Sequence, residues 1–177
     1  SHSAGLEDYR KKLATYYQKI EASISYNDIL ITTGGSEALN TIINCICDPD
    51  DEIIIPDPYY ANYNGFTNSC SVNIEPILCD INKNFQLPDI SQFEAKITKK
   101  TKAILICNPG NPTGALYSLT ELKLLAKVIK KHDLFLIADE VYREFVYDKH
   151  EHHSVLELES IRNNTIIIDS VSKRYSM

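Results

Sequence analysis

Short, continuously apolar segments recur along the chain and alternate with segments of helical periodicity. Apolar runs of roughly four to eight residues are typical of strands buried on both faces, which occur in parallel sheets that helices cover on both sides. We expect strands at 28–32, 51–56, 71–78, 102–107, 134–139 and 164–169. The pattern therefore predicts an α/β fold of three layers, α/β/α, with a mostly parallel central sheet.

Helices are expected between these strands, because apolar residues recur there every three to four positions. The expected helices span 6–20, 36–47, 60–70, 89–97 and 118–132. The length of 177 residues suits one domain, and a hydrophobic content of 44% is enough to bury a full core.

Charge and hydropathy exclude several classes of partner. The net charge of −6 argues against nucleic acid or an anionic membrane surface as a partner. The one basic run, KITKKTK at 96–102, is typical of the solvated end of a helix. No stretch approaches the roughly 20 apolar residues of a membrane span.

Cysteine and histidine usage predicts no metal site. The cysteines show no metal or redox spacing and are expected to be free thiols of a cytoplasmic protein; they are Cys45, Cys47, Cys70, Cys79 and Cys107. The histidines of the HEHH segment are expected in an exposed loop; they are His150, His152 and His153.

In open parallel sheets, ligands bind at the carboxyl ends of the strands, so the segments that follow the strands matter most. After the first expected strand, TGGSEAL (33–39) turns the chain with two glycines and starts a helix. Free N–H groups, the helix dipole and the hydroxyl of Ser36 meet there, which suits a phosphate. A plain serine N-cap after a glycine turn would give the same pattern.

Three further strand ends carry aromatic or polar groups. DPYYANY (57–63) offers a tyrosine that could stack on a flat ring, although packing alone would also explain the cluster. Two Asn-Pro pairs and two glycines in NPGNPTGALY fix a rigid loop that can aim Asn108 and Asn111 at a ligand oxygen. Asp139, in DEVYREF, either caps the next turn or meets a partner, because burying an unpaired charge is costly.

Together with DSVSK (169–173), which follows the last expected strand, these groups fit one molecule, pyridoxal 5′-phosphate. The groups expected to meet its phosphate are Gly35, Ser36 and Ser170. Those expected at its ring and aldehyde are Tyr60 on the ring face, Asn111 and Tyr142 at the ring oxygen, Asp139 at the ring nitrogen and Lys173 at the aldehyde.

The motifs TGGSEAL, PYYANY, NPGNPTG, ADEVY and SVSK resemble those of the fold-type I, aspartate-aminotransferase-like enzymes that use pyridoxal phosphate. They occur in that family's order across nearly all of the 177 residues. The resemblance implies the fold of the family's large, cofactor-binding domain. It also implies a role in amino acid metabolism, with transfer of an amino group from an amino acid to a 2-oxo acid.

The resemblance also implies roles for individual residues. Lys173 would form the Schiff base with the cofactor and later move the substrate's proton, and Asp139 would keep the ring nitrogen protonated. Asn111 and Tyr142 would hold the ring oxygen. The remaining contacts would be Tyr60 on the ring face, the backbone of Gly35, Ser36 and Glu37 at the phosphate, and the hydroxyls of Ser36 and Ser170 at the same group.

The chain departs from the family's pattern in length. Family members are about twice as long, and they add a small domain with the arginine that binds the substrate α-carboxylate. Arg143, Arg162 and Arg174 stand at positions that the family does not use for that role. We therefore expect 1–177 to be the cofactor-binding large domain, truncated at both ends, which binds pyridoxal phosphate weakly or not at all and has little transaminase activity alone. The full-length protein is expected to be a homodimer.

Two alternatives stay open on the sequence. Lyases and decarboxylases of the same fold use the same residues with another reaction. A non-catalytic effector-binding domain of a transcriptional regulator could also carry this fold, since fold analogy alone does not establish activity. The family name alone favours an aspartate-like or broad substrate preference.

Overall fold

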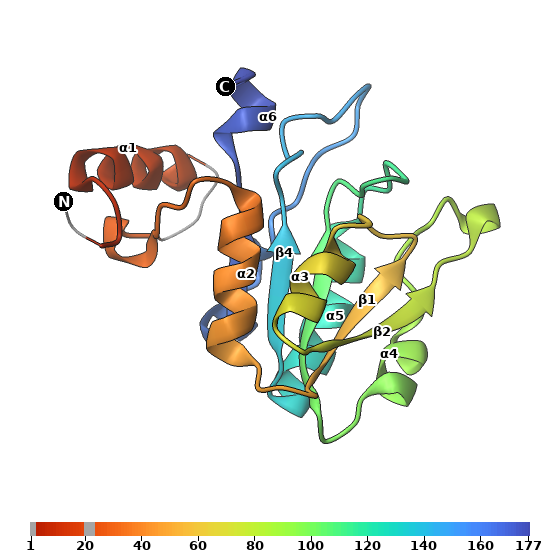
Figure 1. Cartoon of the computed structure of the whole chain (residues 1–177). Coiled ribbons are helices and arrows are strands. Elements are labelled where there is room, and N and C mark those ends of the chain that lie inside the picture. Colours follow the sequence, from red (N-terminus) through yellow and green to blue (C-terminus); the bar gives the residue numbers. More distant parts are fainter. Residues whose placement is uncertain (1–2, 20–23) are drawn as a thin grey trace.

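A parallel five-stranded sheet forms the centre of the molecule, as the computed structural model shows for residues 3–19 and 24–177 (Figure 1). The strands are β1 (Glu52–Asp57), β2 (Asn73–Leu78), β3 (Thr101–Cys107), β4 (Phe135–Asp139) and β5 (Thr165–Ile168). Their order is β2-β1-β3-β4-β5, and every neighbouring pair is parallel. The predicted α/β fold with a mostly parallel sheet is confirmed.

Helices cover both faces of this sheet. The α-helices are α1 (Glu7–Gln18), α2 (Gly35–Ile46), α3 (Tyr63–Ser69), α4 (Ile90–Lys96), α5 (Leu119–His132) and α6 (Val171–Tyr175). Short 3-10 helices span Tyr26–Asp28, Ile81–Lys83, Val155–Glu157 and Glu159–Asn164. On one face, α4 and α5 bury Phe93 and Leu125 against the strands, and on the other, α2 buries Leu39.

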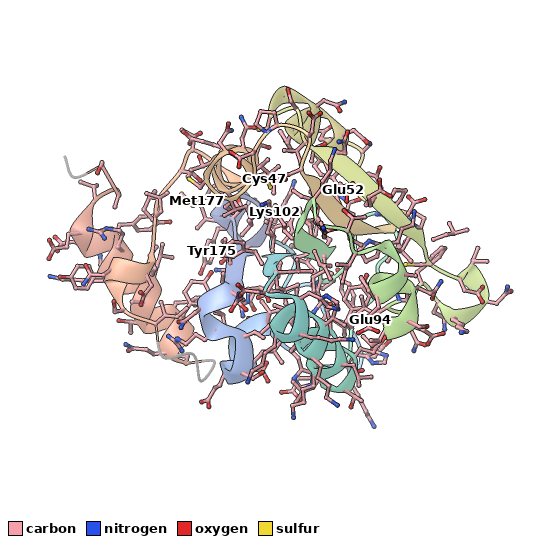
Figure 2. The ribbon with its side chains drawn as sticks, turned by 90° about the horizontal axis from the view of Figure 1, so that it is seen from below. Cys47, Glu52, Glu94, Lys102, Tyr175 and Met177 are labelled. Atoms are coloured by element: carbon pink, nitrogen blue, oxygen red, sulfur yellow. The ribbon has the colours of Figure 1, made fainter. Side chains whose placement is uncertain are left out.

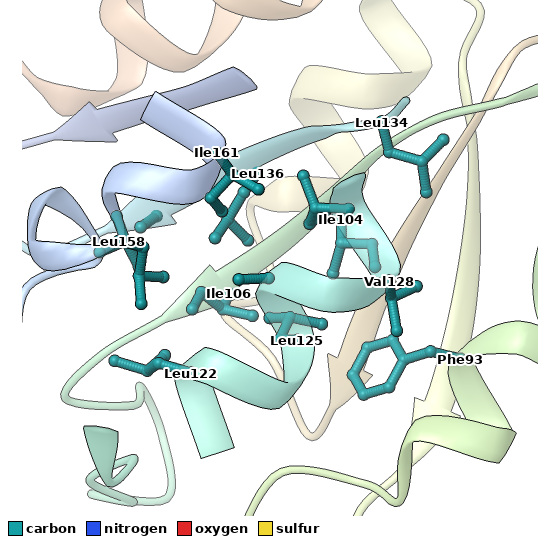
Figure 3. Packing of buried hydrophobic residues seen from close by; sticks show 14 of the residues in the cluster. Phe93, Ile104, Ile106, Leu122, Leu125, Val128, Leu134, Leu136, Leu158 and Ile161 are labelled. Atoms are coloured by element: carbon teal, nitrogen blue, oxygen red, sulfur yellow. The ribbon is translucent and has the colours of Figure 1, made fainter. Parts of the chain in front are cut away.

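The strands are buried on both sides, as continuous apolar runs predict. In β3, Ile104 and Ile106 pack into the cluster under α4 and α5, where Figure 3 shows them beside Leu125. Ala103 and Leu105 alternate with them and pack into the cluster under α2 and α3. This close packing fixes the positions at which the strands end, and with them the groups that follow.

The prediction of a strand at 28–32 is wrong. Its first residue closes the 3-10 helix Tyr26–Asp28, and the chain then runs on without joining the sheet. The N–H of Ile31 donates to the carbonyl oxygen of Ala4 (3.0 Å) rather than to β5. A groove lined by Ile31 and Ile168 lies between the segment and β5. The apolar residues at 28–32 are therefore explained by partial burial beside the sheet and not by strand pairing.

Two expected helices differ from the observed ones by more than one residue at an end. The helix expected at 6–20 is α1, which ends at Gln18, and Ile20 lies outside the described residues. The helix expected at 60–70 begins at Tyr63, which leaves Tyr60 in the turn before α3. In the described part of the chain, no helix is both long and apolar enough to cross a membrane.

The basic run at 96–102 lies where α4 ends and β3 begins, at the amino end of the sheet. Lys96 pairs with Glu75 (3.3 Å), and Lys102 pairs with Asp51 (3.8 Å). Figure 2, which is seen from below, shows Lys102 at this end of the molecule. Two lysines of the basic run thus form ion pairs with carboxylates of this protein.

Candidate active site

A cavity of about 300 Å³ lies at the carboxyl ends of β3, β4 and β5. Of the residues expected to contact the cofactor, its lining includes all except Glu37, namely Gly35, Ser36, Tyr60, Asn111, Asp139, Tyr142, Ser170 and Lys173. The other lining residues are Gly34, Leu39, Tyr63, Phe66, Cys107, Val141 and Ser172. Segments far apart in the sequence meet here because parallel strands end at the same edge of the sheet.

Asp139 ends β4 and is partly buried beside the cavity. Its carboxylate accepts hydrogen bonds from the hydroxyl of Tyr63 (2.7 Å) and from the N–H of Val141 (3.3 Å). Burial raises the pKa of Asp139, whereas these two hydrogen bonds and the charge of Lys173 act in the opposite direction. The site therefore contains a carboxylate that is removed from bulk water but held by donors.

Tyr63 is a site residue that sequence reasoning did not assign to the cofactor. It begins α3, its side chain is almost fully buried, and its ring meets the ring of Tyr60 edge-on at 5.5 Å. Burial, followed by the nearby carboxylate of Asp139, raises the pKa of Tyr63 well above its ordinary value. Tyr63 thus stays protonated and remains a donor to Asp139. Its place in a tyrosine cluster before a helix was the only signal in the sequence.

Lys173 lies in α6, in the short turn that follows β5. Its Nζ is 5.9 Å from the centre of the Tyr142 ring, and the amine lines the cavity. The hydroxyl of Ser170 caps this turn by accepting from the N–H of Ser172 (3.3 Å). The amine, the phenol ring and the serine hydroxyl therefore share one side of the cavity.

The amino end of α2 forms another wall of the cavity. Gly35 begins the helix and lies against β5, since a β-carbon there would lie 3.4 Å from a methyl group of Ile168, at ordinary contact distance. The first N–H groups of a helix have no intrahelical acceptor, and the helix dipole adds positive charge. Ser36, next in the chain, brings a hydroxyl to this wall.

Glu37 does not line the cavity with its side chain. Its carboxylate instead accepts from the N–H of Thr33 (2.5 Å) and from the hydroxyl of Thr33 (2.7 Å). The backbone hydrogen bond from Thr33 is the main reason that the pKa of Glu37 lies below its ordinary value. The side chain therefore closes the turn before α2, and only the backbone N–H of Glu37 belongs to the first turn of the helix.

The loop after β3 brings Asn111 to the cavity but keeps Asn108 away from it. The amide of Asn108 is fully buried; it donates to the carbonyl oxygen of His153 (3.2 Å) and accepts from the N–H of Tyr117 (3.0 Å). The sequence offered both asparagines as groups that could meet a ligand. Asn108 instead holds the loop, and Asn111 is the one that faces the cavity.

The expectation of an exposed histidine loop is wrong for His152. Its side chain is only 8% exposed, and Nε2 lies 3.1 Å from the carbonyl oxygen of Asn108. Burial lowers the pKa of His152 to about 4, so the ring is neutral near pH 7. His150 is exposed, as expected. Within residues 3–19 and 24–177, no cluster of histidine, cysteine and acidic side chains could hold a metal ion.

The cavity has a chemically asymmetric lining. The amino end of α2 offers helix N–H groups and a serine hydroxyl, and Ser170 adds a second hydroxyl to the lining; these donors suit an anionic group. The carboxylate of Asp139 and the rings of Tyr60 and Tyr63 suit a flat ring with a basic nitrogen. Lys173 adds an amine to the lining. The donor set therefore fits a phosphorylated pyridine aldehyde.

Known proteins with similar sequences are aminotransferases. The chain is 34% identical to the aspartate aminotransferase of Bacillus subtilis (strain 168) over 179 residues, which cover 99% of this chain and 45% of that protein. It is also 34% identical to the glutamate-pyruvate aminotransferase AlaA of Escherichia coli (strain K12) over 174 residues, 98% of this chain and 42% of that protein. The chain thus spans less than half the length of these curated relatives.

Solved structures show the same likeness. The aromatic aminotransferase from Pyrococcus horikoshii OT3 superposes with a TM-score of 0.95 at 26% sequence identity, over 100% of this chain and 48% of that one. The whole chain, residues 1–177, matches the family described as aminotransferase class I and II. The chain therefore belongs to that family.

Proposed function

We propose that this chain is the cofactor-binding part of a pyridoxal-phosphate-dependent aminotransferase, which transfers an amino group from an amino acid to a 2-oxo acid. The observation that carries the proposal is that a single cavity is lined by an amine, a carboxylate, an amide and the amino end of a helix. These groups come from Lys173, Asp139, Asn111 and α2. No single one of them is diagnostic, but the set matches the functional groups of one cofactor.

When bound, pyridoxal phosphate draws electrons away from the substrate's α-carbon and so weakens its C–H bond. Asp139 would hold the ring nitrogen in its protonated form by pairing with it. Tyr63 would keep Asp139 ionised and oriented, because its hydroxyl donates to one carboxylate oxygen at 2.7 Å. Tyr60 would lie on the ring face, and Asn111 and Tyr142 would donate to the ring oxygen.

Lys173 would bind the cofactor's aldehyde and then act as the base at the substrate's α-carbon. A lysine amine has an ordinary pKa of about 10.4, so a base at neutral pH requires surroundings that favour the neutral form. The phosphate would lie against the N–H groups of Gly35, Ser36 and Glu37, and the hydroxyls of Ser36 and Ser170 would add two more donors.

The arginines of the described residues support the expectation of weak activity for residues 1–177 alone. Arg174 donates to both carboxylate oxygens of Asp169 (2.9 and 2.7 Å), and Arg143 is buried beside Glu140. Neither lines the cavity. An amino acid's carboxylate would therefore lack an arginine partner there. Robust turnover of an amino acid by residues 1–177 alone would contradict this part of the proposal.

Covalent trapping tests the cofactor assignment. The protein is mixed with pyridoxal phosphate, its visible absorption is recorded, and borohydride reduction is followed by peptide mapping. We expect the reduced label on Lys173. A Lys173→Ala variant should lose the label, whereas Lys149→Ala, which changes an exposed lysine, should keep it. Label spread over surface lysines, or no label, would show that residues 1–177 alone do not hold pyridoxal phosphate, and the same outcome in the full-length protein would contradict the assignment.

A further inference from the structure

The carboxylate of Glu140 is fully buried directly after Asp139, and the proposed chemistry does not use it. Its two oxygens lie 3.0 and 2.9 Å from the hydroxyl of Ser154, which donates to them, and Oε1 also accepts from the N–H of Val155 at 2.9 Å. Nη2 of Arg143 lies 3.7 Å from Oε2. So many partners fix the carboxylate between the end of β4 and the loop at 150–155.

The same loop is bonded on its other side to the segment after β3. The amide of Asn108 donates to the carbonyl oxygen of His153, and Nε2 of His152 donates to the carbonyl oxygen of Asn108. The loop at 150–155 therefore connects the segments that follow β3 and β4, which both rise above the carboxyl end of the sheet (Figure 1).

Each end of this network lies beside a residue that lines the cavity. Asn108 precedes Asn111 in the rigid loop after β3, and Glu140 precedes Tyr142 in the turn after β4. The N–H of Arg143 donates to the carbonyl oxygen of Glu140 (3.0 Å) and closes that turn around Tyr142. The side chains of the network itself do not line the cavity.

We propose that Glu140 is a positioning residue, which through Ser154 and the loop at 150–155 holds Tyr142 and Asn111 in register with each other at the cavity. The relative position of Tyr142 and Asn111 can be measured without a ligand, whereas its effect on the cofactor rests on the proposed function. Apolar side chains of similar volume would usually stabilise such a site at least as well as a buried ion pair. A fully bonded polar network instead holds one geometry.

The coupling of the two segments is tested in the cofactor-free protein by hydrogen–deuterium exchange. Glu140→Gln keeps the size of the side chain but replaces one of its two oxygens, both of which contact Ser154, by an NH2 group that cannot accept a hydrogen bond. Glu151→Gln changes an exposed glutamate of the same loop and is the matched control. We expect exchange to become about tenfold faster in both 109–116 and 141–147 for Glu140→Gln, and to stay unchanged for the control. Faster exchange confined to 141–147 would overturn the coupling.

The link to the cofactor is tested by the absorption of bound pyridoxal phosphate as a function of pH. Donors at the ring oxygen stabilise its ionised form, so looser donors should move the midpoint of the absorption change upward by about 0.5 to 1 pH unit. If both segments exchange faster but the midpoint equals that of the wild type, the network is structural only and the positioning role is overturned.

A second variant keeps the test decisive if Glu140→Gln does not fold. Ser154→Ala removes the hydroxyl that binds both oxygens of Glu140 but leaves the pair with Arg143. It should give the same two changes with smaller size, and their absence would overturn the proposal. A wild-type protein without any cofactor absorption would contradict the proposed function, and the exchange result would still decide the coupling.

Discussion

Ion pairs at the two ends of the parallel sheet differ in how far their side chains are exposed to water. At the amino end, ion pairs lie near the surface: the side chain of Lys102, which pairs with Asp51, keeps 40% of its exposure (Figure 2). At the carboxyl end, the side chains of Glu140 and Arg143 keep 0% and 4%. An acid–base pair therefore keeps one partner exposed at the amino end, whereas both partners are buried at the carboxyl end.

This difference supports the proposed site at the carboxyl end of the sheet. An exposed ion pair contributes about 0–1 kcal/mol, so it can be present or absent with little effect on folding. A buried pair must overcome the cost of removing both charges from water, so it is weak support for stability. Buried charges below polar loops are better explained by the need to hold those loops over a cavity. The carboxyl end is also where Lys173 and Asp139 lie.

The largest expected effect comes from removing one partner of the buried pair. Above about pH 7, where the carboxyl of Glu140 is ionised, Glu140→Ala leaves the guanidinium of Arg143 buried without its carboxylate, and should lower the free energy of unfolding by about 3–5 kcal/mol. Glu75→Ala, which removes the partner of Lys96, should lower it by less than about 1 kcal/mol. Denaturant unfolding measures both. Equal losses would remove the distinction between the two ends.

The buried groups at the carboxyl end should also make the free energy of unfolding depend on pH. Burial raises the pKa of Glu140 from 4.5 to about 7, so the folded chain keeps a proton that the unfolded chain has lost, and stability falls as pH rises across this window. His152 has the opposite sign, because burial lowers its pKa from 6.5 to about 4, and its contribution rises with pH between these values. Arg143 and Asp169 also act on Glu140, in opposite directions.

Glu140→Gln removes the first of these contributions and also the carboxylate that lies 4.0 Å from Nε2 of His152. Its unfolding free energy, relative to that of the wild type, should therefore rise by about 3 kcal/mol between pH 4.5 and pH 7. Denaturant unfolding at several pH values gives this difference directly. A constant difference between variant and wild type across the window would show that the folded carboxyl titrates as it does in the unfolded chain.

A smaller effect is expected at Tyr63. Tyr63→Phe keeps the ring but removes the hydroxyl that donates to Asp139, so the pKa of Asp139 should rise further and its pairing with a protonated ring should weaken. The pyridoxal phosphate concentration for half-maximal borohydride labelling should rise about fivefold to tenfold. Tyr59→Phe is the matched control, because its hydroxyl donates to Asn64 (3.1 Å) at an exposed position. Equal shifts in both variants would argue against a role for Tyr63.

Local patterns were sufficient to predict most of the sheet and much of the cavity. The expected strand at 134–139 is β4, and the expected helix at 118–132 is α5, which begins at the capping box of Ser118 with Glu121. Asp139 could be assigned to the cavity because it directly follows a buried run, and a parallel strand must end at the ligand-binding edge. These signals lie within a few residues of the groups that they identify.

Partners that are distant in the sequence could not be predicted in this way. The sequence signal at Tyr63 is only a local tyrosine cluster, because the carboxylate that its hydroxyl binds is 76 residues later. His152 lies in a polar stretch that is typical of an exposed loop, yet its acceptor is Asn108, 44 residues earlier. The segment at 28–32 has a strand-like pattern, but pairing requires a neighbour in space. In each case tertiary contacts decided the outcome.

The smallest expected effect comes from the amino end and completes the comparison. Lys102→Gln removes the exposed partner of Asp51 and should change the free energy of unfolding by less than about 1 kcal/mol. In about 1 M salt the Debye length falls to about 3 Å, so this change should shrink further, whereas the loss in Glu140→Ala should persist because water and ions do not reach the buried pair. Denaturant unfolding at low and high salt measures both. A loss at Glu140 that salt removes equally would show that the carboxyl end is as accessible to ions as the amino end.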